Sequence, residues 1–206
     1  MTRIKICGIT NQEDALSAVY AGAWALGFIF TRKSPRFISP SRARKIIEAL
    51  PPFVSAVGVF VDLKEGAVKE ICRFTRVSTV QFHGSETPEY CKRFSDRKVI
   101  KAFKVSDDFD FKSVTKFKVD AYLFDTYSPE QEGGTGKAFN WNLLKYEKFD
   151  RPFILSGGLN PANVKAALGA LDPLKAFAVD ASSQLEKAPG QKDNKLVKEF
   201  ISAVTS

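Results

Sequence analysis

The sequence is poor in the residues on which several common chemistries depend. It contains one histidine and three cysteines, Cys7, Cys72 and Cys91, with no Cys-x-x-Cys pair. A three-histidine metal site is therefore excluded, and neither a disulfide framework nor a zinc ribbon is indicated. No run approaches the ~20 apolar residues that cross a bilayer, and the first residues lack the apolar core of a secretory signal. These absences predict a cytoplasmic protein with reduced thiols and no membrane partner.

Composition and charge are those of an ordinary globular chain. Hydrophobic residues make up 44% and charged residues 26% of the 206 residues, which is the usage of folded domains. The net charge of +8 favours an anionic partner, either nucleic acid or a phosphorylated metabolite. The basic residues are scattered, and no helix-turn-helix, zinc finger or RNP-like motif is visible, so we expect no nucleic-acid partner. A basic, non-catalytic anion-binding protein stays open at this point.

Eight β-branched or aromatic runs alternate with amphipathic stretches of helical length. The strands are expected at 3–7, 25–30, 54–61, 79–83, 98–103, 121–125, 152–156 and 176–180. Helix-start signals stand between them: Thr10 with Glu13 as a capping box, Ser39, Thr87 and Asn160. This alternation predicts parallel strands joined by crossover helices, in a doubly wound sheet or a closed barrel. Eight units of roughly 26 residues favour an α/β fold with one domain over 1–206, a (β/α)8 TIM barrel. The absence of Gly-x-Gly-x-x-Gly after the first strand weakens the doubly wound alternative.

A barrel of this type carries its active site at the carboxyl ends of its strands. Cys7, Asp125 and Asp180 each end an expected strand. Alternate side chains of a strand face opposite sides, so these three share a side that the large apolar residues avoid. If the apolar residues face the helices, all three point into the mouth of the barrel.

A phosphate site is predicted at the loops after strands seven and eight. Gly157 and Gly158 end the seventh strand, and glycines let a backbone approach a ligand closely. The loop that contains Ser182 and Ser183 follows the eighth strand, and these two loops often hold phosphate in barrels. The glycine-rich segment at 132–139, "EGGTGKAF", fails the P-loop pattern and is expected to form a flexible loop over the site.

Nine motifs follow one another along the chain: "KICGIT", "GFIF" with "KSPRFISP", "VGVFV", "VQFHG", "LFDT", "GGTGKAFNW", "ILSGGLNPANV", "AVDASS" and "PGQKD". In these motifs the chain resembles the phosphoribosylanthranilate isomerase family along essentially its whole length. The resemblance implies an Amadori rearrangement of a small phosphorylated substrate, N-(5'-phosphoribosyl)anthranilate, in tryptophan biosynthesis. The resemblance also implies that neither a metal nor a cofactor takes part.

The same resemblance implies a role for each candidate residue. Asp125 would be the general acid that opens the ribose ring, and Cys7 the general base that removes the C2' proton. Arg36 would bind the anthranilate carboxylate, for which its planar fork of donors is suited. The remaining candidates would contact the substrate: Gln81, His83, Asp180 at the sugar hydroxyls, and Gly157, Gly158, Ser182 and Ser183 at the phosphate.

Four points stay open in the sequence. ProFAR isomerase performs the same rearrangement on another phosphorylated substrate, but such barrels use an aspartate where this chain has Cys7. A thiol needs a nearby positive charge to act as a base, and Lys5 on the same strand face is the candidate. Gln184 stands where the family commonly has glycine, and would crowd the phosphate loop if a positive φ is needed there. The sequence does not decide between a monomer and a homodimer.

Overall fold

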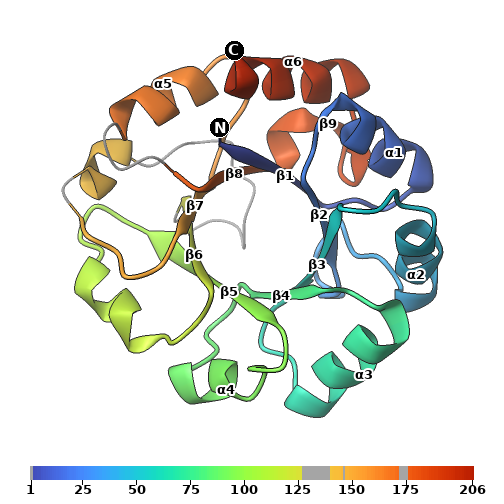
Figure 1. Cartoon of the computed structure of the whole chain (residues 1–206), viewed down its shortest axis with the longest axis horizontal. Coiled ribbons are helices and arrows are strands. Elements are labelled where there is room, and N and C mark those ends of the chain that lie inside the picture. The colour runs from blue at the N-terminus through green and yellow to red at the C-terminus, as the bar shows by residue number, and fades with distance from the viewer. Residues whose placement is uncertain (1, 127–139, 146, 172–175) are drawn as a thin grey trace.

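The computed structural model describes residues 2–126, 140–145, 147–171 and 176–206, and the expected glycine-rich loop at 132–139 lies outside them. Eight parallel strands form a closed barrel in sequence order, with β8 pairing back onto β1 (Figure 1). The strands are β1 Arg3–Cys7, β2 Ala25–Ile29, β3 Ser55–Phe60, β4 Thr79–Phe82, β5 Lys98–Val105, β6 Ala121–Thr126, β7 Phe153–Leu155 and β8 Ala178–Ala181. The predicted (β/α)8 barrel is confirmed.

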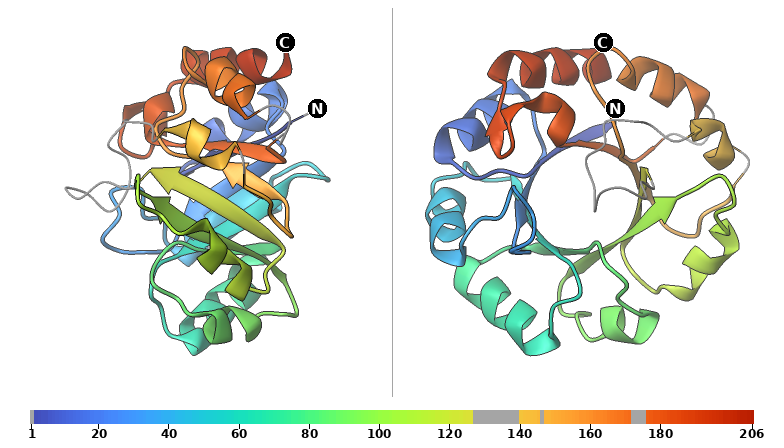
Figure 2. Two further views of the ribbon diagram at one scale, coloured as in Figure 1. Left: turned by 90° about the vertical axis from the view of Figure 1, so that its left-hand side faces the viewer. Right: turned by 180° about the vertical axis from the view of Figure 1, so that it is seen from behind.

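Helices form a ring around the barrel, as both end-on views show (Figures 1 and 2). They are α1 Gln12–Ala21, α2 Pro40–Glu48, α3 Glu65–Thr75, α4 Pro88–Lys92, α5 Val164–Ala170 and α6 Asn194–Thr205. Two 3-10 helices, η1 Phe111–Lys116 and η2 Trp141–Leu144, occupy positions after β5 and β6 where α-helices were expected. No helix in the described ranges is both long enough and apolar enough to span a membrane.

The connection between β8 and α6 contains structure that the sequence pattern did not reveal. A 3-10 turn, η3 Ser183–Leu185, is followed by a short antiparallel hairpin of β9 Glu186–Ala188 and β10 Gln191–Lys192. Gly190 has a φ of +79° in the turn of this hairpin, a conformation that glycine adopts without cost. The hairpin lies at the carboxyl end of the barrel beside the end of β1.

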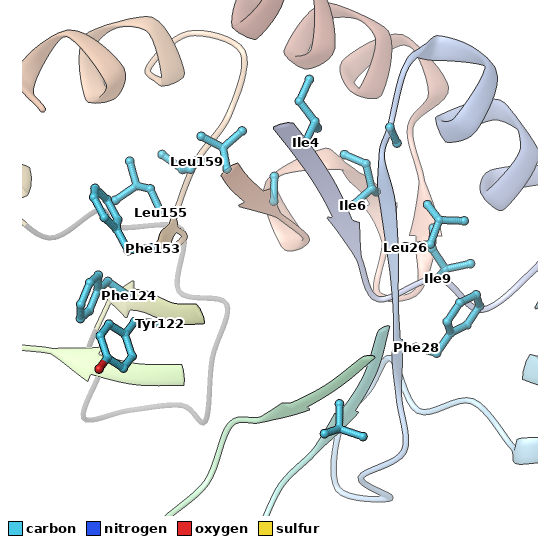
Figure 3. Packing of buried hydrophobic residues seen from close by; sticks show 14 of the residues in the cluster. Ile4, Ile6, Ile9, Leu26, Phe28, Tyr122, Phe124, Phe153, Leu155 and Leu159 are labelled. Carbon is cyan, nitrogen blue, oxygen red and sulfur yellow. The ribbon is translucent and has the colours of Figure 1, made fainter. Parts of the chain in front are cut away.

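Alternating side chains build two separate apolar clusters. Ile4, Ile6, Leu26 and Phe28 belong to the large outer cluster, and Figure 3 shows them on the helix side of β1 and β2. The smaller cluster fills the barrel interior and consists of Val57, Ile100, Ala102, Ala121, Leu123, Ile154 and Ala178. The predicted parity is therefore confirmed: the large apolar residues face the helices, and the alternate positions face inward.

Two of the four predicted helix starts are confirmed. The hydroxyls of Ser39 and Thr87 accept hydrogen bonds from the first turns of α2 and α4. The capping box at Thr10 is wrong, because the Thr10 hydroxyl donates to the carbonyl of Gly190 and Asn11 caps α1 instead. Asn160 is also not a helix cap: its amide oxygen accepts from the next backbone N–H groups, in a turn that precedes α5.

Replacing Asn11 with alanine tests this reassignment of the cap. Asn11 Oδ1 accepts from the backbone N–H of Asp14 at 2.8 Å, so Asn11→Ala should lower the free energy of unfolding by about 1 kcal/mol. Glu13→Ala on the exposed side of the same turn should change it by less than about 0.5 kcal/mol. Urea unfolding followed by circular dichroism measures both. A larger loss for Glu13→Ala would restore the capping box.

Candidate active site

The three residues predicted at the barrel mouth do face the interior. Cys7, Asp125 and Asp180 alternate with residues of the outer cluster, and Asp125 and Asp180 continue the inward positions of Leu123 and Ala178. Cys7 and Asp180 are 6% and 4% exposed, so both are nearly sealed from solvent. Asp180 interacts electrostatically with Asp125 and with Lys5, and Cys7 interacts with Asp180. The predicted convergence of these side chains is therefore present.

A buried ion pair lies at the centre of this group. Lys5 and Asp180 are register partners on β1 and β8, and Lys5 Nζ donates to Asp180 Oδ1 at 2.9 Å. Burial works to lower the pKa of Lys5, but the Asp180 carboxylate and the neighbouring Cys7 outweigh it and raise that pKa. Lys5 is therefore a permanent cation one layer below the sulfur.

Cys7 is held in a site that opposes its ionisation. Burial raises the pKa of the Cys7 thiol and Asp180 adds to the rise, while the cations Lys5 and Lys192 counteract them. The sequence analysis gave Lys5 the correct sign, but it could not show that burial is the larger effect. Gly27 on β2 provides the space for the sulfur, since a Cβ there would lie 2.6 Å from Cys7 Sγ. A glycine inside a strand signals a close approach of this kind.

Gln81, His83 and Asp125 form a chain of hydrogen bonds across the barrel end. Gln81 Nε2 lies 2.9 Å from His83 Nδ1, and His83 Nε2 lies 3.1 Å from Asp125 Oδ2. The other carboxyl oxygen, Oδ1, accepts from the backbone N–H of Thr126 at 2.8 Å. Gln81 is fully buried, and both Gln81 and His83 are hydrogen-bonded to other protein groups. Their expected contact with a substrate stays a prediction.

Arg36 lies at the same end of the barrel, held by the hairpin after β8. Its Nε is 3.0 Å from both Glu186 carboxyl oxygens, and Glu186 also accepts from Lys192 Nζ at 2.7 Å. Lys192 in turn donates to the carbonyl of Ser182, whose hydroxyl donates to the carbonyl of Cys7. Sequence reasoning missed Glu186 and Lys192, although "PGQKD", the segment that contains Lys192, was among the motifs of the resemblance.

The first of the two predicted phosphate loops has a backbone that depends on glycine. Gly157 has a φ of +88°, and a Cβ there would overlap Thr126, so the seventh loop requires glycine. Gly158 follows with a φ of +64°. Gln184 lies in the 3-10 turn η3 and is not among the described residues with positive φ, so the condition under which crowding was expected at this position is not met. Phosphate binding by Gly157, Gly158, Ser182 and Ser183 stays a prediction.

Comparison with known proteins gives a consistent result over the whole chain. The profile of the family described as N-(5'phosphoribosyl)anthranilate (PRA) isomerase matches residues 4–203. The N-(5'-phosphoribosyl)anthranilate isomerase of Geobacter metallireducens is 48% identical over 201 residues, covering 98% of each chain. The crystal structure of phosphoribosyl anthranilate isomerase from Thermotoga maritima superimposes with a TM-score of 0.92 at 44% identity, covering 100% of this chain and 99% of that one. A structure of the enzyme in complex with reduced 1-(o-carboxyphenylamino)-1-deoxyribulose 5-phosphate superimposes with a TM-score of 0.88 at 42% identity, with the same coverage.

The charges around Cys7 make a prediction about its reactivity. Because its pKa is raised, alkylation by iodoacetamide should follow a pH midpoint above that of a free cysteine. Lys5→Met should move the midpoint further up, and Asp180→Asn should move it down, since the two charges act on the sulfur with opposite signs. The rate is measured in a Cys72→Ala/Cys91→Ala background, so that Cys7 is the one thiol that can be alkylated. Equal midpoints in all three proteins would contradict the assigned electrostatics.

Proposed function

The chain belongs to the N-(5'-phosphoribosyl)anthranilate isomerase family, and we propose that it performs that family's Amadori rearrangement with Asp125 as the acid and Cys7 as the base. As a member of this family it is an isomerase of tryptophan biosynthesis. The product would be 1-(o-carboxyphenylamino)-1-deoxyribulose 5-phosphate, the compound whose reduced form is bound in one of the similar structures. The observation that supports the assignment is the convergence of Cys7 and Asp125 on the buried Lys5–Asp180 pair.

The first proposed step opens the ribose ring. Asp125 gives a proton to the ring oxygen, the bond between C1' and that oxygen breaks, and the nitrogen lone pair forms a cationic imine. The proton that Asp125 loses becomes the proton of the new 4'-hydroxyl. A carboxylic acid placed at the ring oxygen can contribute a rate factor of about 10²–10⁴.

The second step removes a proton from C2'. The cationic imine makes this C–H acidic, and Cys7 as the thiolate takes the proton. The C–H electrons form a C1'–C2' double bond, and the electron pair of the imine π bond returns to nitrogen. Burial disfavours the thiolate, but the positive imine adds to the cations Lys5 and Lys192 beside the sulfur once the ring is open. The enol then relaxes to the ketone: its hydroxyl loses a proton to solvent, and C1' takes one from solvent. The positive imine therefore favours the Cys7 thiolate at the step in which the thiolate acts as the base.

Binding is assigned to the groups at the rim. Glu186 accepts from Nε of Arg36 and pairs with its Nη2. Because a guanidinium has five N–H donors, the remaining donors of Arg36 are free to bind the anthranilate carboxylate in this proposal. Asp180 would contact the sugar hydroxyls. The backbones of Gly157, Gly158, Ser182 and Ser183 would hold the phosphate, and the scheme uses neither a metal nor a cofactor.

The other expectations from the sequence enter the proposal in the same way. We expect one domain over 1–206, a cytoplasmic location and no nucleic-acid or membrane partner. A similar protein, the enzyme of Thermotoga maritima, is described as dimeric. For this chain we expect either a monomer or a homodimer. ProFAR isomerase stays the alternative activity, and the cysteine at the end of β1 disfavours it.

Two substitutions test the acid and the base. Cys7→Ser and Asp125→Asn should each lower kcat about 10²–10⁴-fold, because each removes one proton-transfer group. The loss of phosphoribosylanthranilate fluorescence measures turnover, and ProFAR is assayed in parallel as the rival substrate. Asp107→Asn, at an exposed carboxylate, is the control and should keep full activity. Undiminished turnover in either site variant would remove that residue from the mechanism.

A third substitution tests the carboxylate site. Arg36→Met should raise KM about 10–100-fold, the effect of losing charge-assisted hydrogen bonds worth about 1.5–3 kcal/mol. Inhibition by inorganic phosphate should stay unchanged, since that ion occupies the other end of the substrate site. Arg32→Met, an exposed arginine of the same loop, should alter neither quantity. An unchanged KM for Arg36→Met would refute the assignment, and so would an equal loss of phosphate inhibition.

A further inference from the structure

Gln81 carries a buried polar atom without a partner. The residue is 0% exposed, and within the described part of the chain its Oε1 makes no hydrogen bond. Its strand neighbours on either side are apolar, Val59 on β3 and Ile100 on β5. An unpaired buried acceptor costs about 1–3 kcal/mol, so natural structures contain few of them and each calls for an explanation.

The orientation of this amide fixes the proton on His83. Gln81 Nε2 can only donate, so His83 Nδ1 at 2.9 Å must accept and the ring proton lies on Nε2. Nε2–H then donates to Asp125 Oδ2 at 3.1 Å, while Thr126 N–H donates to Oδ1. Asp125 accepts at both oxygens, as a carboxylate does. In this arrangement the residue assigned as the general acid offers no proton to a substrate, because both of its oxygens accept.

We propose that Gln81 and His83 are positioning residues that load Asp125 with its proton through rotation of the Gln81 amide, an inference that rests on the proposed function. Turning the amide by half a revolution places Oε1 against His83 Nδ1. The ring can then bind a solvent proton at Nδ1, which donates to Oε1. The Nε2 proton passes along the hydrogen bond to Asp125 Oδ2, leaving a neutral acid beside a neutral imidazole.

The proton balance closes over one turnover. One proton enters at Nδ1, one leaves Nε2 for Asp125, and Asp125 passes one to the ring oxygen of the substrate. Cys7 returns the proton taken from C2' to solvent. The ring resets when Nδ1 releases its proton to solvent and Nε2 takes one up from solvent, and the amide turns back. In this scheme the Oε1 atom that is unpaired in the structure accepts from His83 Nδ1–H when Asp125 is protonated.

Charged groups of both signs lie around His83. Asp125 on β6 is its direct partner, and Asp180 on β8 interacts electrostatically with it. The facing cations are Lys5, which is paired with Asp180, and Lys104, the register partner of Asp125 on β5.

The single histidine of the chain gives a direct test. In the free protein labelled with 15N-histidine, NMR should show a neutral ring with hydrogen on Nε2 and none on Nδ1. Gln81→Glu, which can only accept, should place hydrogen on Nδ1 and keep the ring protonated to higher pH. A wild-type ring with hydrogen on Nδ1, or an unchanged spectrum in Gln81→Glu, would overturn the proposal. This readout does not depend on turnover.

Kinetics supply the second readout. Gln81→Met keeps the size of the side chain but removes the acceptor, so kcat should fall about tenfold or more with KM nearly unchanged. Gln12→Met, an exposed glutamine of α1, should keep the wild-type kcat. NMR dispersion checks that Gln81→Met is folded, and an unchanged kcat in the folded variant would refute the relay. If Asp125→Asn keeps full turnover, the acid assignment fails instead, whatever the state of the His83 ring.

Discussion

The ion pair between Lys5 and Asp180 is the constraint around which the active end is arranged. Its two residues come from the first and last strands of the barrel, 175 positions apart in sequence, and the pair lies where β8 closes onto β1. Both side chains are almost completely buried, and a buried charge is strongly unfavourable once its partner is lost. Closure of the barrel is therefore tied to the pairing of these two groups. The same pair interacts electrostatically with Cys7, and Asp180 also interacts with Asp125, so the pair links the sulfur and the carboxyl group.

The strands could be predicted because their pattern is local. Ile4 and Ile6 alternate with Lys5 and Cys7 within one short run. Because Ile4 and Ile6 are buried against the helices, Lys5 and Cys7 must point to the opposite side of the strand. The helix starts were harder, because a cap depends on what else is in reach. Thr10 has the right type and spacing for a cap, but the distant Gly190 carbonyl takes its hydroxyl, and Asn11 caps the helix instead. The hairpin of β9 and β10 was missed because strands of two or three residues have no readable period.

The candidate site divides in the same way. Cys7, Asp125 and Asp180 were placed correctly because strand ends and parity are visible in the sequence. Their electrostatic setting was not, since burial depends on the whole fold and here outweighs the cations that oppose it at Cys7. Gly27 could have been recognised as a strand glycine, but its neighbour, the sulfur of Cys7, follows only from the pairing of β1 with β2. Glu186 and Lys192 act through side chains that meet across a loop, for which one sequence offers no pairing signal.

The hairpin after β8 connects the two ends of the proposed chemistry. Glu186 fixes the fork of Arg36, and Lys192 neutralises Glu186 and lowers the cost of a thiolate at Cys7. Ser182 joins the same segment to the carbonyl of Cys7, so a displacement of the hairpin would move the proposed carboxylate site and the surroundings of the proposed base together. Gly8 belongs to this contact, because a Cβ there would lie 2.8 Å from Arg36 Cδ and 2.9 Å from Ser182 Oγ. A side chain at that position would displace Arg36 or Ser182, two of the residues proposed to bind the substrate, which is a physical reason for glycine immediately after the cysteine.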